Sequence, residues 1–150
     1  TVKLYRYKNQ AELFVQAFSH FKNLKFEIFD TYQEVMSNSD VIISAITYAQ
    51  QDFCDEKYYK KGCLIVPIHT LGFQNCDLVF DKVYGDDYGH IKDFKYFNKF
   101  KQFNEVAEVL KNKSLGRSNN EERILAYNIG LAIHDIFFAQ KILNLIENQK

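Results

Sequence analysis

The chain has 150 residues, enough for one domain with its own core, and 47% of them are hydrophobic. Lysine plus arginine and aspartate plus glutamate each number 19, so the net charge is zero. This balance argues against a basic surface for nucleic acid or for an anionic membrane, and we expect neither as a partner.

Short runs rich in β-branched and aromatic residues alternate with helical patterns along the chain. Strands are expected at 2–7, 25–30, 41–46, 63–68 and 81–86, the last of the series, and helices at 10–21 and 31–37. The runs at 41–46 and 63–68 are continuously apolar, as in strands covered by helices on both faces. The alternation predicts a parallel sheet built from right-handed strand–helix–strand units.

The three cysteines, Cys54, Cys63 and Cys76, form no Cys-x-x-Cys pair and leave an odd number. This usage favours a reducing compartment, and we expect a cytoplasmic protein. A zinc site that combines them with His69 would have irregular spacings, so no metal is expected.

Lysines and aromatic residues interleave between residues 92 and 101, a composition that suggests a stacking platform for bases. The spacing of Phe94, Phe97 and Phe100 fits the inward face of an amphipathic helix better. We therefore predict a helix here and no nucleic-acid site.

The C-terminal third begins with a helix-capping signal. Ser118 and Glu121 have the spacing of a capping box, so a helix is expected to begin near Asn119. From 124 to 146 the apolar residues recur at the three-and-four spacing of a helix that is buried on most sides.

Polar residues inside this apolar run need partners if they are buried. Asn128, His134 and Asp135 would each bond to backbone, to water or to a ligand. They also break the run, which therefore does not fit a membrane span. Gly130 is costly inside a helix and indicates close approach by another element or a ligand.

Two motifs in this third are specific. They are Gly116-Arg117 and, after a polar turn, Asn128-Ile129-Gly130-Leu131-Ala132 followed by Asp135. Their order resembles the C-terminal signature of the ornithine cyclodeaminase / mu-crystallin family. Segments similar to the rest of that family's dinucleotide-binding domain lie at 39–47, 61–66, 83–87 and 105–113.

The resemblance implies an α/β fold, a Rossmann-like parallel sheet with helices on both faces and a long C-terminal helix. Residues 1–150 would be part of an NAD(P)-binding domain, with 116–150 as the family's C-terminal helical segment. No Gly-x-Gly-x-x-Gly or Gly-x-Gly-x-x-Ala occurs, and 2–7 matches the family's second strand. We therefore expect a fragment without the first strand and glycine turn, which would lie between the strands at 2–7 and 41–46.

Ligands bind such sheets beyond the carboxyl ends of the strands. The residues there are Arg6 to Asn9, Thr47-Tyr48, His69-Thr70 and Asp86-Asp87. The resemblance implies NADP or NAD as cofactor, with Thr47 and the turn of Asn128, Ile129 and Gly130 against its nicotinamide side.

The end of the first strand bears on the choice of cofactor. Enzymes for NAD carry an acid there, whereas Arg6 and Lys8 suit the 2′-phosphate of NADP. The alternative is an exposed strand end with ordinary solvated bases. NADP is slightly favoured.

The loop after the strand at 63–68 departs from the family. Cyclodeaminases carry a catalytic acid there, but this chain has none before Asp77. His69 is a possible substitute, since a neutral imidazole shuttles protons near pH 7, or else a hydrogen-bonded wall residue. Asp77 is a weaker catalytic candidate.

The resemblance implies a fragment of an NAD(P)-dependent oxidoreductase that exchanges hydride at the amine or imine carbon of an amino acid or cyclic imine. The parent protein would be a cyclodeaminase, amino-acid dehydrogenase or ketimine reductase, and a homodimer is possible. The family's substrate-binding Arg and catalytic Lys have no counterpart here, so the fragment itself is expected to be inactive. The alternative is a non-catalytic NADP(H)-binding protein of the mu-crystallin type. A flavodoxin-like or receiver domain would need an early acidic cluster or phosphate loop, which the sequence does not offer.

Overall fold

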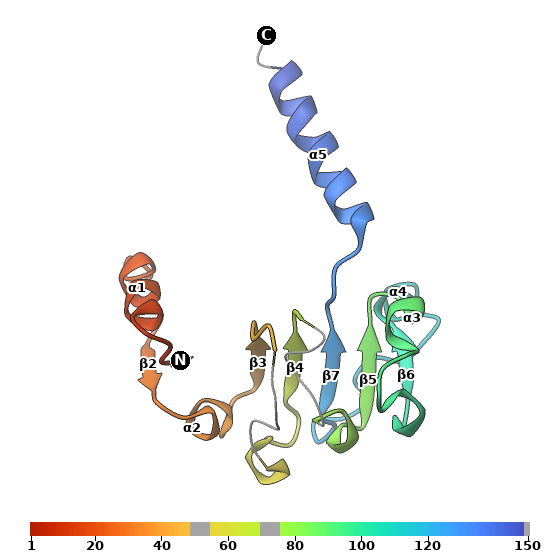
Figure 1. The fold of residues 1–150 in the computed structure, drawn as a ribbon, viewed down its shortest axis with the longest axis horizontal. Helices are drawn as coiled ribbons and strands as arrows, with labels where there is room; N and C mark the ends of the chain where they lie inside the picture. The colour runs from red at the N-terminus through yellow and green to blue at the C-terminus, as the bar shows by residue number, and fades with distance from the viewer. Residues whose placement is uncertain (49–54, 70–75, 149–150) are drawn as a thin grey trace.

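The computed structural model describes residues 1–48, 55–69 and 76–148 (Figure 1). Its elements, with η for 3-10 turns, are β1 (Val2–Tyr5), α1 (Gln10–Ala17), β2 (Phe26–Phe29), α2 (Tyr32–Met36), β3 (Val41–Ser44), η1 (Glu56–Tyr58), β4 (Leu64–Pro67), η3 (Cys76–Val79), β5 (Lys82–Gly85), α3 (Tyr88–Ile91), η4 (Phe97–Lys99), β6 (Phe103–Glu105), α4 (Val106–Leu110), β7 (Ile124–Tyr127) and α5 (Ala132–Glu147). All strand pairs are parallel. The predicted fold class is confirmed.

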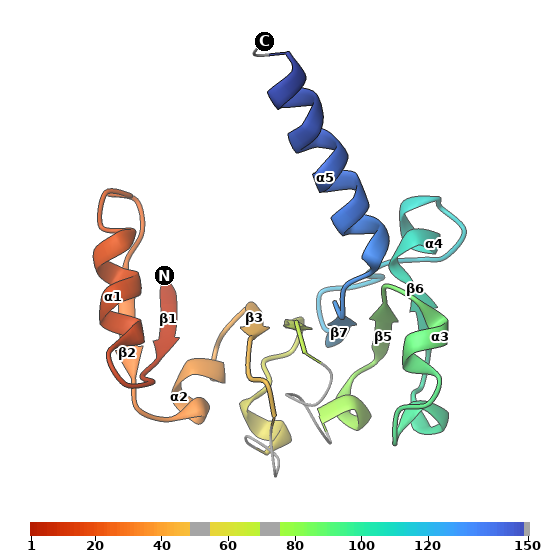
Figure 2. The same ribbon diagram turned by 45° about the horizontal axis from the view of Figure 1, so that its top comes forward.

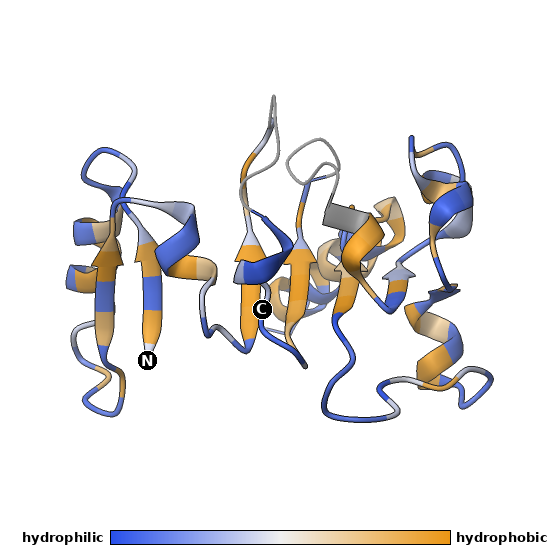
Figure 3. Cartoon of the chain, turned by 90° about the horizontal axis from the view of Figure 1, so that it is seen from below, coloured by the Kyte–Doolittle hydropathy of each residue, from blue (hydrophilic) through white to orange (hydrophobic). Residues whose placement is uncertain are grey.

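The strands form two sheets, a pair β1-β2 and a five-stranded sheet in the order β3-β4-β7-β5-β6. In Figure 2, β1 lies between β2 and β3, and Figure 3 shows the strands of the two sheets side by side, seen from below. β1 and β3 are not hydrogen-bonded to each other. The break between the sheets lies where the resemblance implies a further strand.

Helices lie on both faces, with α1 above the strands and α2 below them in Figure 1. The predicted helix at 31–37 is confirmed as α2. The Thr31 hydroxyl oxygen accepts from the Glu34 backbone N–H at 3.3 Å and lies 2.6 Å from the Glu34 carboxylate. These contacts satisfy an otherwise free N–H group at the start of the helix.

The prediction of a helix beginning near Asn119 is wrong. Residues 124–127 form β7, which pairs with β4 on one side and β5 on the other. A short apolar run fits strand and helix alike, and burial between two partner strands decides this one. The C-terminal helix, α5, begins at Ala132.

The predicted capping box is also wrong. The Ser118 backbone N–H donates to Glu122 Oε2 at 2.7 Å, and the Asn119 side-chain oxygen accepts from the N–H groups of Glu121 and Glu122 at 2.9 and 3.2 Å. An Asn side chain that bonds the next backbone groups makes a turn, and this turn leads into β7.

The segment 92–101 is not one helix. It contains the turn η4, and Phe94, Phe97 and Phe100 nevertheless pack against the core as expected. Their spacing of three residues fits a 3-10 turn as well as one face of an α-helix. The chain then enters β6 at the edge of the sheet, so the strand expected at 81–86, seen as β5, is not the last.

The core lies around the central strands β4, β7 and β5. Ile65 and Leu125 are fully buried, and Val83 and Phe80 are 1% exposed. β3 is covered on one face only, because Val41 and Ile43 are 58% and 69% exposed. The prediction that both faces of this strand are covered is wrong for this chain.

Helix α5 projects away from the sheet in Figures 1 and 2. All of its side chains are exposed, so the prediction of burial on most sides is wrong within the described part of the chain. Helix α1 is shorter than the predicted 10–21, and its Leu13 and Phe14 are exposed while Ala11 is buried. None of the described helices is long and apolar enough to cross a membrane.

Candidate functional site

Backbone hydrogen bonds join the carboxyl ends of neighbouring strands. Beyond the ladder, the Ile68 N–H donates to the Ser44 carbonyl and the Asn128 N–H to the Pro67 carbonyl, each at 3.0 Å. The ends of β3, β4 and β7 are therefore held side by side. Side chains that follow these strands meet at one edge, where parallel sheets bind ligands.

A side chain extends this connection to β5. Asp86 Oδ2, just after β5, accepts a hydrogen bond from the Gly130 backbone N–H at 2.7 Å. Gly130 has a φ of +92°, a conformation that residues with a side chain rarely adopt. Among the described residues, apart from its two chain neighbours, no atom lies within 4 Å of the position that a Cβ would take. The turn between β7 and α5 thus presents open backbone at the carboxyl edge.

Two buried polar atoms at this edge have no hydrogen-bond partner among the described residues. They are Ser44 Oγ, at the end of β3, and Asp86 Oδ1. Buried polar atoms in folded proteins are nearly always paired. These two atoms are therefore an unusual feature of the carboxyl edge.

Three of the predicted site residues follow neighbouring strands of the larger sheet. Thr47 follows β3, His69 follows β4 and Asn128 follows β7, and all three are exposed. Ile129 is partly buried and packs against the core. The loop 70–75 and the Asp77 side chain lie outside the described residues.

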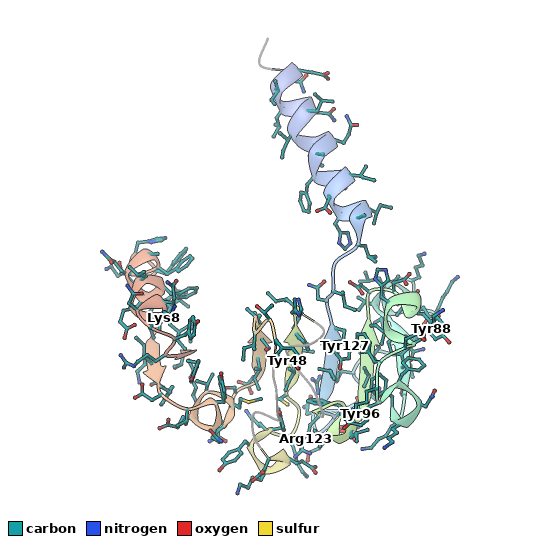
Figure 4. All side chains as sticks on the ribbon, viewed as in Figure 1. Lys8, Tyr48, Tyr88, Tyr96, Arg123 and Tyr127 are labelled. Atoms are coloured by element: carbon teal, nitrogen blue, oxygen red, sulfur yellow. The ribbon has the colours of Figure 1, made fainter. Side chains whose placement is uncertain are left out.

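Arg6 and Lys8 follow β1, in the separate two-stranded sheet. The Arg6 guanidinium contacts Glu12 on α1 through Nη1 and lies 2.7 Å from Asp30 Oδ1 through Nε. Lys8, labelled in Figure 4, has its Nζ 5.3 Å from the centre of the Tyr7 ring. Sequence reasoning missed Glu12 and Asp30, although an acid in the first turn of a helix that follows a strand was a usable signal.

A different set of charges lies at the amino ends of the strands. Asp81, before β5, accepts from the Arg123 backbone N–H at 3.0 Å and from Lys101 Nζ at 2.9 Å. These two bonds lower the pKa of Asp81. Arg123, labelled in Figure 4, also pairs with Glu56 at 2.7 Å. These contacts hold the sheet together at the edge opposite the site.

A buried lysine reinforces the same amino edge. Lys82 Nζ donates to the Gly116 carbonyl and to Ser118 Oγ, both at 2.6 Å, and lies 3.2 Å from Glu122. The pKa of Glu122 is lowered, first by the Ser118 N–H and then by Lys82. The Gly116-Arg117 motif therefore supports β5 structurally.

Neither a metal site nor the described cysteine competes with the carboxyl edge as a candidate. They contain no group of His, Cys, Asp and Glu that could hold a metal ion. Cys63 is fully buried, and burial raises the pKa of its thiol, which makes it a poor nucleophile. The carboxyl edge is the candidate site.

Two solved structures share this fold. The Δ1-pyrroline-2-carboxylate reductase of Thermococcus litoralis, solved in complex with NADH and L-proline, is 20% identical with a TM-score of 0.74, over 92% of this chain and 47% of that one. A probable ornithine cyclodeaminase of Bordetella pertussis Tohama I is 11% identical with a TM-score of 0.76, over 99% of this chain and 52% of that one.

Sequence comparison gives one further similar protein. The nodulation efficiency protein NfeD of Rhizobium meliloti is 22% identical over 116 residues, which are 73% of this chain and 36% of that protein. No family model matches the chain. The chain thus spans about half the length of the two solved relatives and about a third of NfeD. The resemblance to the ornithine cyclodeaminase / mu-crystallin family is confirmed in the fold, which this chain shares with a pyrroline-2-carboxylate reductase and a probable ornithine cyclodeaminase.

Proposed function

We propose that residues 1–150 form part of the NAD(P)-binding domain of a cytoplasmic oxidoreductase that exchanges hydride at the amine or imine carbon of a small amino acid or cyclic imine. One observation carries the proposal. The carboxyl ends of β3, β4, β7 and β5 form one edge of the sheet. The fold is shared with an enzyme solved in complex with NADH and L-proline. Open parallel sheets bind dinucleotides at this edge.

Four residues would lie against the nicotinamide side of the cofactor: Thr47, Asn128, Ile129 and Gly130. Within the described part of the chain, no residue other than the two chain neighbours comes within 4 Å of a Cβ position on Gly130, which leaves room for a flat ring to approach the backbone. Asn128 is exposed, while its N–H is fixed to the Pro67 carbonyl, so its amide can face a ligand from a rigid position. When bound, nicotinamide supplies the hydride chemistry and the protein supplies orientation.

His69 would move the proton that accompanies this chemistry. It follows β4, beside the ends of β3 and β7, and it is exposed. An imidazole can accept or donate a proton near neutral pH, which an amine-to-imine conversion requires. Asp77 is the second candidate for this role.

The phosphate-binding part would come from a strand between β1 and β3. The two strands belong to different sheets, and β1 is the strand of its pair that lies next to β3 in Figure 2. Unpaired strand edges offer rows of N–H and C=O groups that a further parallel strand can pair with. That strand would lead into the glycine turn that this sequence does not contain.

The protein as its gene encodes it should be titrated with NADH and NADPH and then assayed with cyclic imines. Binding of a cofactor together with imine reduction supports the proposal, and His69→Asn should then reduce turnover about 100-fold or more while cofactor affinity stays within about threefold. Binding without turnover would favour the non-catalytic alternative. Absence of binding to both cofactors would contradict the dinucleotide assignment itself.

A further inference from the structure

The Arg6 side chain is already engaged by two carboxylates. The strand register places Tyr5 opposite Phe29, so Arg6 and Asp30 are the next pair, and the Arg6 N–H donates to the Phe29 carbonyl at 2.8 Å. Arg6 Nε lies 2.7 Å from Asp30 Oδ1, and Nη1 contacts Glu12 Oε1. Each of the two edges with which a guanidinium grips a phosphate therefore has one donor in use.

The charge around Arg6 does not favour a further anion. Arg6 with Glu12 and Asp30 sums to −1, and including Lys8 only brings the group to zero. These ion pairs are exposed and cost little to break. Even with the pairs broken, both carboxylates would remain beside a 2′-phosphate bound to Arg6, and they would repel its nearly two negative charges. The charge balance, more than the pairing, opposes such a phosphate.

The two carboxylates are instead suited to neutral hydroxyls. Each uses one oxygen for Arg6, and within the described residues nothing donates to Glu12 Oε2 or Asp30 Oδ2. Glu12 lies in the first turn of α1, where the helix dipole favours a negative charge. A ribose hydroxyl that donates to a carboxylate makes a charge-assisted hydrogen bond, the usual recognition of NAD.

We propose that Glu12 and Asp30, held in place by Arg6, select NAD(H) over NADP(H). This rests on the proposed function, and it reverses the preference that Arg6 and Lys8 indicate in the sequence. Arg6 acts through the carboxylates and positions them, and it does not grip a phosphate. Neither acid is one of the residues expected from the sequence to bind the cofactor.

The test is the ratio of NADH to NADPH affinity, measured by cofactor fluorescence on the protein as its gene encodes it. The wild type should bind NADH at least about tenfold more tightly than NADPH. The double variant Glu12→Gln/Asp30→Asn should narrow the ratio to within about threefold, because it leaves Arg6 and Lys8 as uncompensated cations. Glu121→Gln, which removes an exposed carboxylate paired with Lys61 at the far edge, should leave the ratio unchanged.

The contrary outcomes are distinct. Tighter binding of NADPH by the wild type, lost in Arg6→Ala, would mean that Arg6 grips the phosphate, and would overturn this inference while the proposed function stands. An unchanged ratio in the double variant would also overturn it. If neither cofactor binds the wild type, the proposed function fails and the inference fails with it.

Discussion

Asp86 and Gly130 are joined across 44 residues by a hydrogen bond of 2.7 Å from the Gly130 backbone N–H to Asp86 Oδ2. The bond fastens the end of β5 to the turn that connects β7 with α5. Because Gly130 has a φ of +92°, the conformation of this turn depends on a glycine and on one carboxylate together. Both partners lie at the candidate site.

This relationship predicts coupled effects of substitution at the two positions. Asp86→Ala should destabilise the fold by about 2 kcal/mol, the usual loss of a hydrogen bond to a charged group. Gly130→Ala should cost about 1 kcal/mol from backbone strain alone, since a Cβ there meets no atom of the described residues within 4 Å beyond its chain neighbours. In urea unfolding, the loss of unfolding free energy in the double variant should be smaller, by at least about 0.5 kcal/mol, than the sum of the losses in the two single variants.

Asp87→Ala is the matched control for this cycle. Asp87 caps α3 by accepting from the His90 N–H at 3.2 Å, so its loss also removes a side-chain acceptor from the chain just after β5. Its effect should add to that of Gly130→Ala within about 0.3 kcal/mol. If the effects of Asp86→Ala and Gly130→Ala were also additive, the hydrogen bond would not determine the conformation of the turn between β7 and α5.

A second prediction concerns the buried Lys82. Lys82→Met removes the donor to the Gly116 carbonyl and to Ser118, and leaves these groups without their partner in a buried setting. The expected loss of unfolding free energy is on the order of 2 kcal/mol. Lys101→Met, which removes an exposed lysine from Asp81, should cost about 0.5 kcal/mol. Equal losses of unfolding free energy in the two variants would show that the burial of Lys82 does not strengthen its contribution to stability.

Acid should weaken the amino edge of the sheet through Asp81. The pKa of this carboxyl is lowered by the Arg123 N–H and then by Lys101, so the folded state favours the ionised form. Its contribution is complete above the unfolded pKa of about 4 and is lost as the pH falls through the lower folded value. Thermal unfolding between pH 6 and pH 2.5 should therefore lose less stability in Asp81→Asn than in the wild type. A parallel decline in both proteins would contradict this assignment.

The exposed helix α5 should contribute little to the stability of the sheet. Ile136 is 68% exposed, so Ile136→Glu should change the unfolding free energy by less than about 0.5 kcal/mol. Leu125 on β7 is fully buried, and Leu125→Ala should cost about 2–5 kcal/mol. Denaturant unfolding of both variants measures the difference. A large loss in Ile136→Glu would mean that α5 packs against the sheet in solution.

Sequence periodicity predicted the strands that are apolar and flanked by turns. β3 and β4 are short, mainly apolar runs with consecutive β-branched residues, so their length and composition both indicate strands. β7 was missed because its four residues run straight into a helical pattern, and only pairing with β4 and β5 distinguishes the two. β6 was missed because Phe103–Glu105 is short and mostly polar, as an edge strand can be.

The candidate site was predictable as a location, since parallel strands deliver their following residues to one edge. Its polar contacts were not. The position of Glu12 after a strand marked it as a candidate, but the contacts of Glu12 and Asp30 with Arg6 depend on the placement of α1 and on the register of β1 with β2, which local sequence does not show. The Asp86 contact to Gly130 likewise requires β5 and β7 to be neighbours.

The break between β1 and β3 also has a consequence for how the molecule opens. The unit of β1, α1 and β2 shares no strand ladder with the larger sheet, and the chain connects the two through α2. Lys3 Nζ on β1 donates to the carbonyls of Glu34 in α2 and of Ser37 just after it, at 3.2 and 2.6 Å. Such a unit can unfold without disturbing the core around Leu125. Amide hydrogens of β1 and β2 should therefore exchange with solvent before those of β4 and β7, so that this chain behaves as two cooperative units of unequal stability.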